Sequence, residues 1–298
     1  MLALLIAAAA PVEMLMLDVN CRIEPVTAAG EGANLFHGLS PDGRELAVGW
    51  ERGEGTGTER GAFILNLKTG KRTPLPQLNN APTFSPDGRF LVAANFTGDP
   101  NRKTDIVELD RKTGATKTYA SDPATEWLAS YSKDGKWILF NSMRTGNSDL
   151  YRVERASGKI ERLSNAANYE AHGKYVDGDR NILFHRNVRG DDYDVAIMDP
   201  RTGRSRAIGA TPLEEAYPAM SPDGRWIAFS ATEAPGEQPN LFLMKREGSG
   251  KYRLTDGPDK DAYATWSRDG RAIYFVRFAK DGGRIYRLKM KNGACAPR

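Results

Sequence analysis

The chain has 298 residues, and several features that it lacks exclude particular classes of function. It contains no apolar run near the roughly 18 residues of a membrane-spanning helix. Its 42 Lys and Arg are scattered beside 38 Asp and Glu, without the basic stripe typical of nucleic-acid binding. It also lacks the Gly-x-Ser-x-Gly pentapeptide of covalent serine hydrolases. We therefore expect no transmembrane segment, no nucleic-acid partner and no serine hydrolase.

The composition itself is that of a folded, turn-rich protein. Hydrophobic residues make up 40% of the chain, charged residues 27%, and there are 30 glycines, which excludes a disordered chain. The first ten residues form an apolar run that ends in alanines and looks like a secretory signal. We predict a signal peptide or disordered start over residues 1–14 and a periplasmic or secreted protein, with a buried first strand as another reading of the run.

One short stretch recurs at nearly even spacing. Its first copy is Leu39-Ser40-Pro41-Asp42-Gly43-Arg44, followed by an apolar run. Five more copies begin at Phe84, Tyr131, Tyr175, Met220 and Trp266. The intervals between the successive aspartates Asp42, Asp87, Asp134, Asp177, Asp223 and Asp269 are 45, 47, 43, 46 and 46 residues. This is the length of a four-stranded propeller blade, so the repeat predicts six blades.

Two turn signals in each repeat indicate four antiparallel strands. In the first repeat we expect strands at residues 34–39, 45–50, 62–67 and 72–78, with turns at residues 40–43 and 68–70. Continuous apolar runs such as Trp137-Ile138-Leu139-Phe140 fit strands that are covered on both faces by neighbouring blades. The predicted fold class is all-β, with residues 15–298 forming one six-bladed, monomeric propeller.

The two cysteines bear on how the ring closes. A propeller avoids a bare edge by pairing strands from its two termini. The last repeat supplies three strands, and residues 21–26 resemble the fourth strand of the next repeat at residues 71–75. We expect residues 22–26 to complete the last blade and to bring Cys21 close to Cys295. A disulfide between them is predicted, with two unpaired thiols as the alternative.

The Ser-Pro-Asp-Gly-Arg turn followed by an apolar strand resembles the WD40-like PD40 repeat of the TolB family, from about residue 34 onward. Three copies carry the full Ser-Pro-Asp-Gly, and three depart from it, at Lys133, at Arg268 and across residues 176–179. The absence of a Trp-Asp dipeptide argues against true WD40 repeats. The resemblance implies a six-bladed propeller, here expected to stand alone without the N-terminal domain that TolB carries. It also implies roles ranging from partner binding in the periplasm to gating in oligopeptidases.

Polar residues recur at the start of the first strand of each repeat. They stand six positions before the serine, or before Val176 in the fourth repeat, and they are Asn34, Asn79, Glu126, Glu170, Glu215 and Asp261. In a propeller the first strand lies nearest the axis, and its start shares a face with the loop between the second and third strands. We therefore predict that these six residues ring the mouth of the central channel.

The loops on that face carry several arginines, of which Arg144, Arg186 and Arg277 follow the second strands of their repeats. Two readings of the ring stay open. Each carboxylate can pair with a neighbouring arginine as part of the blade architecture. Alternatively, the ring binds a ligand, because four carboxylates on one small circle repel one another unless a positive group compensates them. The predicted ligand-binding residues are the six ring residues and these three arginines.

The histidines give a weak metal signal. His172 and His185 flank one turn and are expected to be cross-strand neighbours, whereas His37 lies three blades away. A metal site would require convergence across the channel, and partly buried, hydrogen-bonded histidines are the alternative.

These patterns together favour an exported, non-enzymatic propeller that binds or scaffolds a protein or peptide partner through its channel mouth. No cofactor is predicted for this function. The alternative is a propeller enzyme of the polysaccharide lyase or lactone hydrolase type that uses a divalent cation in the channel.

Overall fold

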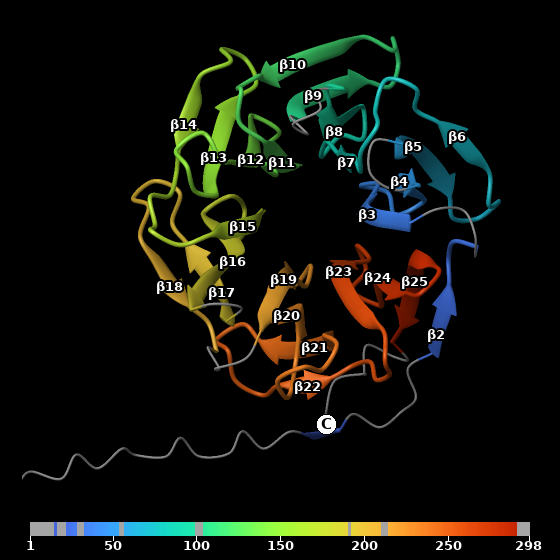
Figure 1. Ribbon diagram of the computed structural model, residues 1–298, viewed down its shortest axis with the longest axis vertical. Helices are drawn as coiled ribbons and strands as arrows, with labels where there is room; N and C mark the ends of the chain where they lie inside the picture. The colour runs from blue at the N-terminus through green and yellow to red at the C-terminus, as the bar shows by residue number, and fades with distance from the viewer. Residues whose placement is uncertain are drawn as a thin grey trace, which may run out of the picture.

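The computed structural model describes residues 15–16, 22–28, 33–53, 57–98, 104–189, 192–209 and 214–290. Within these ranges the chain forms β-strands that are grouped into six sheets around a central axis (Figure 1). The predicted six-bladed β-propeller of four-stranded antiparallel blades is confirmed. No helix in these ranges is long and apolar enough to cross a membrane. Residues 1–14, Cys21 and Cys295 lie outside them, so the signal segment and the disulfide stay predictions.

Each of the first five blades runs outward from the axis in chain order, and blade 6 takes its outer strand from the N-terminal segment. Blade 1 contains β3 (Ala33–Leu39), β4 (Glu45–Arg52), β5 (Glu59–Asn66) and β6 (Arg72–Pro74). Blade 2 contains β7 (Thr83–Phe84), β8 (Phe90–Phe96), β9 (Thr104–Asp110) and β10 (Thr116–Ala120). Blade 3 contains β11 (Glu126–Tyr131), β12 (Trp137–Ser142), β13 (Asp149–Glu154) and β14 (Ile160–Arg162).

The second half of the ring repeats this order. Blade 4 contains β15 (Glu170–Val176), β16 (Asn181–Arg189), β17 (Asp192–Met198) and β18 (Ser205–Ala207). Blade 5 contains β19 (Glu215–Met220), β20 (Trp226–Ala231), β21 (Asn240–Lys245) and β22 (Tyr252–Arg253), beside which β1 (Leu15–Met16) lies in parallel. Blade 6 contains β23 (Lys260–Trp266), β24 (Ala272–Ala279), β25 (Gly282–Lys289) and β2 (Arg22–Pro25).

Strand β2 closes the ring. It pairs antiparallel with β25, from Arg22 opposite Lys289 to Pro25 opposite Tyr286. Blade 6 is therefore built from both ends of the described chain (Figure 1). This confirms the predicted closure by the N-terminal segment.

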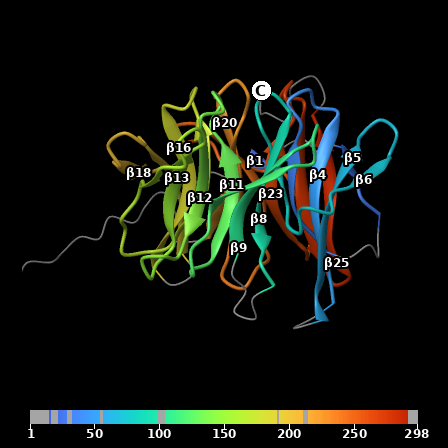
Figure 2. The same cartoon turned by 90° about the horizontal axis from the view of Figure 1, so that it is seen from above.

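The second strand of each blade forms the core. Ile138, Leu139 and Phe140 in blade 3 are fully buried, as are Phe184, Phe229 and Phe275 in the next three blades. These strands are apolar on both faces because each blade packs between two others, as Figure 2 shows from the side. The expectation drawn from the continuous apolar runs is confirmed.

The Ser-Pro-Asp-Gly turns have one recurring hydrogen-bond pattern. In blade 2 the buried Ser85 donates from Oγ to Asp87 Oδ1 over 2.5 Å and accepts from the Phe90 amide over 2.8 Å. Gly88 has φ of 72°, a value that an L side chain rarely adopts. The turn thus uses serine to bracket the hairpin and glycine to reverse the chain.

Two details of the sequence-based assignment differ from the structure. The strand expected at residues 72–78 ends at Pro74, because Pro76 has no amide hydrogen to extend the ladder and a turn follows. In blade 4 the register pairs Val176 with Asn181, so Asp179 occupies the glycine position with φ of 69°. The repeat therefore falls one residue later there than the aspartate spacing indicates.

Candidate functional site at the channel and its mouth

The predicted ring residues lie at the starts of the inner strands, but they are not open to solvent. Five of them are at most 3% exposed. These five are Asn34, Glu126, Glu170, Glu215 and Asp261. Asn79 is partly exposed, and its side-chain amide exchanges hydrogen bonds of 2.8 Å with the backbone of Phe96. The ring therefore lies inside the blade junctions, beneath the surface of the mouth.

Three of the carboxylates form ion pairs with basic residues. Asp261 accepts two hydrogen bonds of 2.7 Å from Arg277 on the adjacent strand β24. Glu126 pairs with Arg144, which lies in the loop after β12. The partner of Glu215 is Lys251, a residue that the sequence analysis did not select. Two of the three predicted arginines thus contact the ring, which matches the architectural reading.

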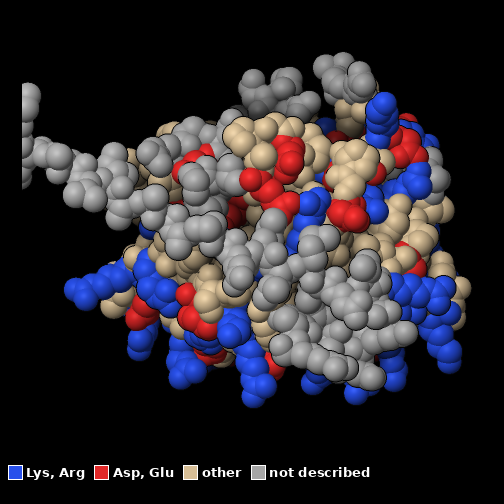
Figure 3. All heavy atoms as spheres, turned by 90° about the horizontal axis from the view of Figure 1, so that it is seen from below, with Lys and Arg blue, Asp and Glu red and all other residues tan. Residues whose placement is uncertain are grey.

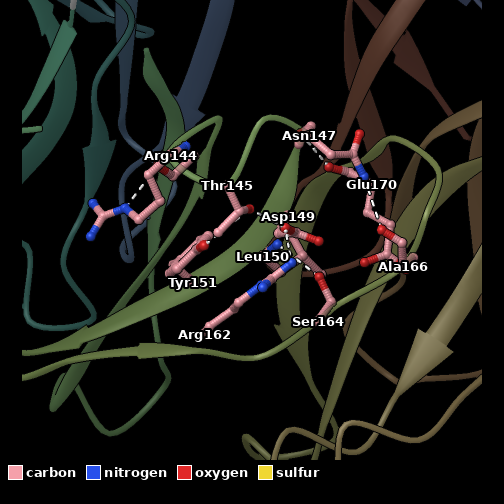
Figure 4. Close-up of polar contacts among 12 residues, drawn as sticks. Arg144, Thr145, Asn147, Asp149, Leu150, Tyr151, Arg162, Ser164, Ala166 and Glu170 are labelled. Atoms are coloured by element: carbon pink, nitrogen blue, oxygen red, sulfur yellow. Dashed lines mark hydrogen bonds and ion pairs between the residues drawn. The ribbon is translucent and has the colours of Figure 1, made fainter. Parts of the chain in front are cut away.

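Glu170, which is labelled in Figure 4 among the residues at the junction of blades 3 and 4, has no such ion pair within the described part of the chain. Its backbone carbonyl accepts hydrogen bonds from Asn141 Nδ2 over 2.7 Å and from Ser148 Oγ over 2.6 Å. Arg186 lies opposite it in the β15–β16 register and lowers the pKa of its carboxyl. Burial has the larger effect and leaves that pKa raised.

A buried hydroxyl joins neighbouring blades at three of the junctions. Ser164 Oγ accepts a hydrogen bond of 2.9 Å from the Leu150 amide. Ser164 also bonds to the side chain of Glu170 in the next blade, and this hydrogen bond lowers the pKa of Glu170. Thr255 accepts from the Leu241 amide in the same way and lowers the pKa of Asp261. Thr27 accepts from Ile285 and from Asn34 at the closure. Glu170, Asp261 and Asn34 therefore act as anchors between blades.

Burial controls the ionisation of these carboxylates. It raises the pKa of Glu126 to about 7, against the opposing effect of Arg144. It also raises the pKa of Asp261, although Arg277 lowers it in part. A ligand at the mouth has no direct access to groups this deeply buried. The ligand-binding role of the ring and its arginines stays an untested prediction, and the geometry favours the architectural alternative.

An aromatic cluster lies on the inner strands, and the sequence analysis found its histidines but missed its tyrosines. His172, Tyr217 and Tyr263 each stand two positions after a ring residue and have φ between 55° and 59°. Leu128 in blade 3 has the same backbone conformation. At each site the pairing of the inner strand contains a bulge. Such left-handed backbone costs about 1–3 kcal/mol per residue and tends to occur at functional sites.

The cluster is continuous across blades 4, 5 and 6. The ring centroids of Tyr217 and Tyr263 are 4.4 Å apart, and those of His172 and Tyr217 are 4.5 Å apart. His172 also lies 4.7 Å from His185, which confirms that the two histidines are cross-strand neighbours. We call His172, His185, Tyr217 and Tyr263 the channel cluster.

Both histidines of the channel cluster are neutral. His185 Nδ1 accepts a hydrogen bond of 3.0 Å from the Tyr217 amide, so that nitrogen carries no proton. Burial lowers the pKa of His185 to about 3 and lowers that of His172 as well. Among the described residues there is no group of three or more His, Cys, Asp or Glu that can hold a metal ion. The side chain of His37 lies outside the description.

Half-buried aromatic side chains surround the mouth. They lie where inner strands begin, second strands end or third strands begin, which are the ends that face the mouth. They are Trp50, Phe96, Trp127, Tyr169, Tyr193 and Phe278. Met143, in the loop after β12, is 37% exposed. Aromatic residues, Met and Arg are enriched in the cores of protein interfaces, so we call these six aromatics and Met143 the mouth patch.

Comparison with known proteins gives a consistent result. The family model of the TolB beta propeller domain, PD40, matches residues 34–238. An uncharacterized protein of Agrobacterium fabrum is 31% identical over 214 residues, which cover 66% of this chain and 69% of that relative. The Tol-Pal system protein TolB of Francisella tularensis is 28% identical over 206 residues and shares 67% of this chain.

A solved structure of a TolB protein is similar to this chain as well. The crystal structure of TolB from Acinetobacter baumannii superposes with a TM-score of 0.64 at 26% identity, over 77% of this chain and 56% of that one. The matched region is 46% of the length of the Francisella TolB. The chain therefore spans about half the length of these TolB proteins.

Proposed function

The chain belongs to the PD40 family of TolB β-propeller domains, and on that basis we propose that it binds a protein or peptide partner in the cell envelope through its mouth patch. The observation that carries this proposal is the mouth patch itself. It combines half-buried aromatics with an exposed methionine, on the face where the loops between second and third strands emerge.

The contacts that mouth-patch rings make with neighbouring residues suit a preformed binding surface. Arg60 stacks on Phe96 with 4.3 Å between the guanidinium carbon and the ring centroid, and Tyr263 packs edge-on against Phe278 at 5.9 Å. Rings held by neighbours lose little conformational freedom on binding, which is a property of interface hot spots. The relatives named as Tol-Pal system proteins and the apolar start of the chain support an envelope location, periplasmic or secreted.

The test is a comparative capture from an envelope extract after cross-linking, with the native protein as bait. Met143→Glu and Trp127→Ala alter the mouth patch, while Lys136→Ala alters an exposed turn on the opposite face. We expect one partner to be enriched by the native protein and by K136A and to be lost with the two patch variants. Equal recovery by all four folded proteins, checked by circular dichroism, contradicts the proposal.

The enzyme alternative, a lyase or lactone hydrolase with a divalent cation, stays untested, and no observation favours it over partner binding. A structure of crystals soaked in Mn²⁺ or Ca²⁺ distinguishes the two, because a metal enzyme has protein ligands within about 2–2.6 Å of one density peak in the channel.

A further inference from the structure

The face of the propeller opposite the mouth is formed by two sets of hairpin turns. In a blade of four antiparallel strands, the turn after the first strand and the turn after the third strand lie on the same side. Eleven such turns join consecutive strands of the six blades. They are residues 40–44, 67–71, 85–89, 111–115, 132–136, 155–159, 177–180, 199–204, 221–225, 246–251 and 267–271. We call the side that they form the turn face.

The turn face is strongly basic. Its eleven turns contain 18 Lys and Arg but only nine Asp and Glu, which is a formal charge of +9. The whole chain has a formal charge of +4, so the rest of it carries −5. Basic residues that are scattered along the sequence therefore gather on one side of the fold. Figure 3 shows a row of Lys and Arg side chains projecting from one edge of the molecule.

The cations of the first set of turns are open to solvent. An exposed Lys or Arg ends this turn in every blade, and these residues are Arg44, Arg89, Lys136, Arg180, Arg225 and Arg271. The side chains of Arg44 and Lys136 are 82% and 74% exposed, and they lie 3.9 and 3.8 Å from their own turn aspartates. Ion pairs that are this exposed contribute little, so these charges stay available to a partner.

The turn aspartates are already engaged by their own turns. Asp42 Oδ1 accepts hydrogen bonds from Ser40 Oγ over 2.6 Å and from the Arg44 amide over 3.1 Å. Asp223 accepts from Ser221 Oγ and from the Arg225 amide in the same way, over 2.6 and 3.1 Å. These carboxylates therefore stabilise the turn backbone and leave the neighbouring arginines exposed.

The second set of turns adds cations without ion-pair partners. Lys68, Lys71, Lys112 and Arg204 are exposed, and none of them forms an ion pair with any residue that the structure describes. They belong to blades 1, 2 and 4, while the exposed residues of the first set come from all six blades. The positive charge thus covers a broad face, and the repulsion within it favours an anionic partner.

We propose that the turn face docks on an anionic lipid bilayer through its exposed Lys and Arg side chains. A bilayer of acidic lipids is a broad negative surface that attracts cations within a Debye length of it. Charges from all six blades fit such a surface better than a linear nucleic acid, which a protein contacts along a stripe. The mouth patch then faces away from the lipid. This inference goes beyond the proposed function, because it concerns the opposite face and a lipid partner.

The first test is co-sedimentation of the native protein with phosphatidylcholine vesicles that contain either no phosphatidylglycerol or about one-third of it. We expect binding to the acidic vesicles to be about tenfold or more tighter than to the neutral ones at low salt. High salt should abolish the difference, because it screens exposed charges. Equal binding to both kinds of vesicle, or no binding to either, overturns the proposal.

Matched variants locate the binding face. Lys68→Gln with Lys112→Gln removes two exposed charges from the turn face, while Arg52→Gln with Lys280→Gln removes two exposed charges from the mouth side. Both variants lose the same net charge, and only the first should weaken vesicle binding, by about fivefold or more. Equal weakening by the two variants means that net charge alone governs binding, which contradicts docking through the turn face.

Amine labelling of the vesicle-bound native protein reports its orientation. Trace acetylation followed by peptide mass spectrometry should show Lys68 and Lys112 labelled about threefold or more slowly on acidic vesicles, with Lys280 unchanged. Uniform slowing contradicts the proposal. Tighter binding of short single-stranded DNA than of acidic vesicles assigns a nucleic-acid surface instead and also overturns it.

The vesicles contain no protein, so these measurements do not depend on the mouth partner. Capture of that partner by the variant with K68Q and K112Q should equal capture by the native protein. Loss of vesicle binding with normal capture therefore affects only the lipid proposal, and the reverse result affects only the proposed function.

Discussion

At the scale of single residues, the same inner strands carry two kinds of polar side chain. The carboxylates of Glu126, Glu215 and Asp261 point into blade junctions and have basic partners. Two positions further along, His172, Tyr217 and Tyr263 adopt left-handed backbone and pack against one another. The first set anchors the blades, while the second forms a strained aromatic layer along the inner strands.

The first residue-scale prediction compares two carboxylates with different partners. The side chain of Lys251 is only 12% exposed, and Glu215→Gln leaves it without its charge partner. This substitution should lower the free energy of unfolding by about 3 kcal/mol. Glu170→Gln removes a carboxyl whose pKa is already raised by burial and should change stability by about 1 kcal/mol or less. Urea unfolding of both variants measures the difference.

A double variant of Glu170 and Glu215 tests whether the ring residues bind a ligand or only stabilise the blades. If Glu170→Gln with Glu215→Gln lowers the melting temperature and keeps full capture of the mouth partner, the ring is structural. Weakened partner affinity at an unchanged melting temperature would instead support a binding role.

The second residue-scale prediction concerns pH. The pKa of His185 is about 3 in the folded protein and about 6.5 when unfolded, so unfolding takes up a proton below pH 6.5. Its contribution to stability is present above pH 6.5 and is lost as pH falls toward 3. Glu126 acts in the opposite sense, because its pKa of about 7 makes the folded state gain stability as pH falls from 7 to 4.5.

A matched variant isolates the histidine. In His185→Asn an amide oxygen replaces the Nδ1 acceptor without titrating, so the stability difference from the native protein should shift toward the variant below pH 6.5. The expected slope is up to about 1.4 kcal/mol per pH unit, measured by urea unfolding from pH 7.5 to 5. A pH-independent difference means that His185 titrates normally in the fold.

At the scale of elements, the turn between the first two strands is the repeated unit of stability. Ser85 is 1% exposed and makes one donor and one acceptor bond inside its turn. Ser85→Ala should cost about 1–2 kcal/mol, because the Phe90 amide and the Asp87 carboxylate lose a buried partner. Thermal unfolding checks this, with Thr113→Ala in an exposed turn as the control.

The divergent turn of blade 4 has a compensating role between blades. Asp177 accepts two bonds of 2.5 Å from Arg246 of blade 5. Asp179 accepts from the amides of Lys133 and Asp134 in blade 3, over 2.7 and 3.0 Å. The loss of the serine bracket at Val176 is therefore accompanied by links to both neighbouring blades.

At the scale of the whole molecule, stability depends on the junction where β2 completes blade 6. Thr27 is 2% exposed, and its hydroxyl accepts from the Ile285 amide over 3.0 Å and from Asn34 over 3.3 Å. Thr27→Val should lower the free energy of unfolding by about 1–3 kcal/mol, because a buried amide loses its partner. Thr73→Val on the exposed outer strand β6 is the control, measured by urea unfolding. Equal effects of the two substitutions contradict a special role for the closure.

The predicted link between Cys21 and Cys295 belongs to the same scale. Peptide maps of exported protein, run with and without reductant, should differ by one cross-linked pair. Because the link closes nearly the whole chain into a loop, its reduction should cost about 2–5 kcal/mol if the bond is unstrained. Two free thiols in oxidised, exported protein contradict this prediction.

The sequence by itself determined the number of blades, the position of the turns and the closure by residues 22–25. These features are local and periodic: a serine bracket, a glycine with positive φ and a buried apolar strand recur in nearly every repeat, and a missing fourth strand is visible by comparison between repeats. The same alignment located the ring residues correctly at the starts of the inner strands.

Only the tertiary structure decided what those residues contact. Glu215 pairs with Lys251, 36 positions away, because the side chain of that lysine crosses the blade past Phe229. His172, Tyr217 and Tyr263 meet because a bulge in each inner strand redirects the side chain, and the curvature of the ring brings three blades together. Side-chain direction after a bulge and contact across blades depend on the packed ring, and neither leaves a periodic trace in the sequence.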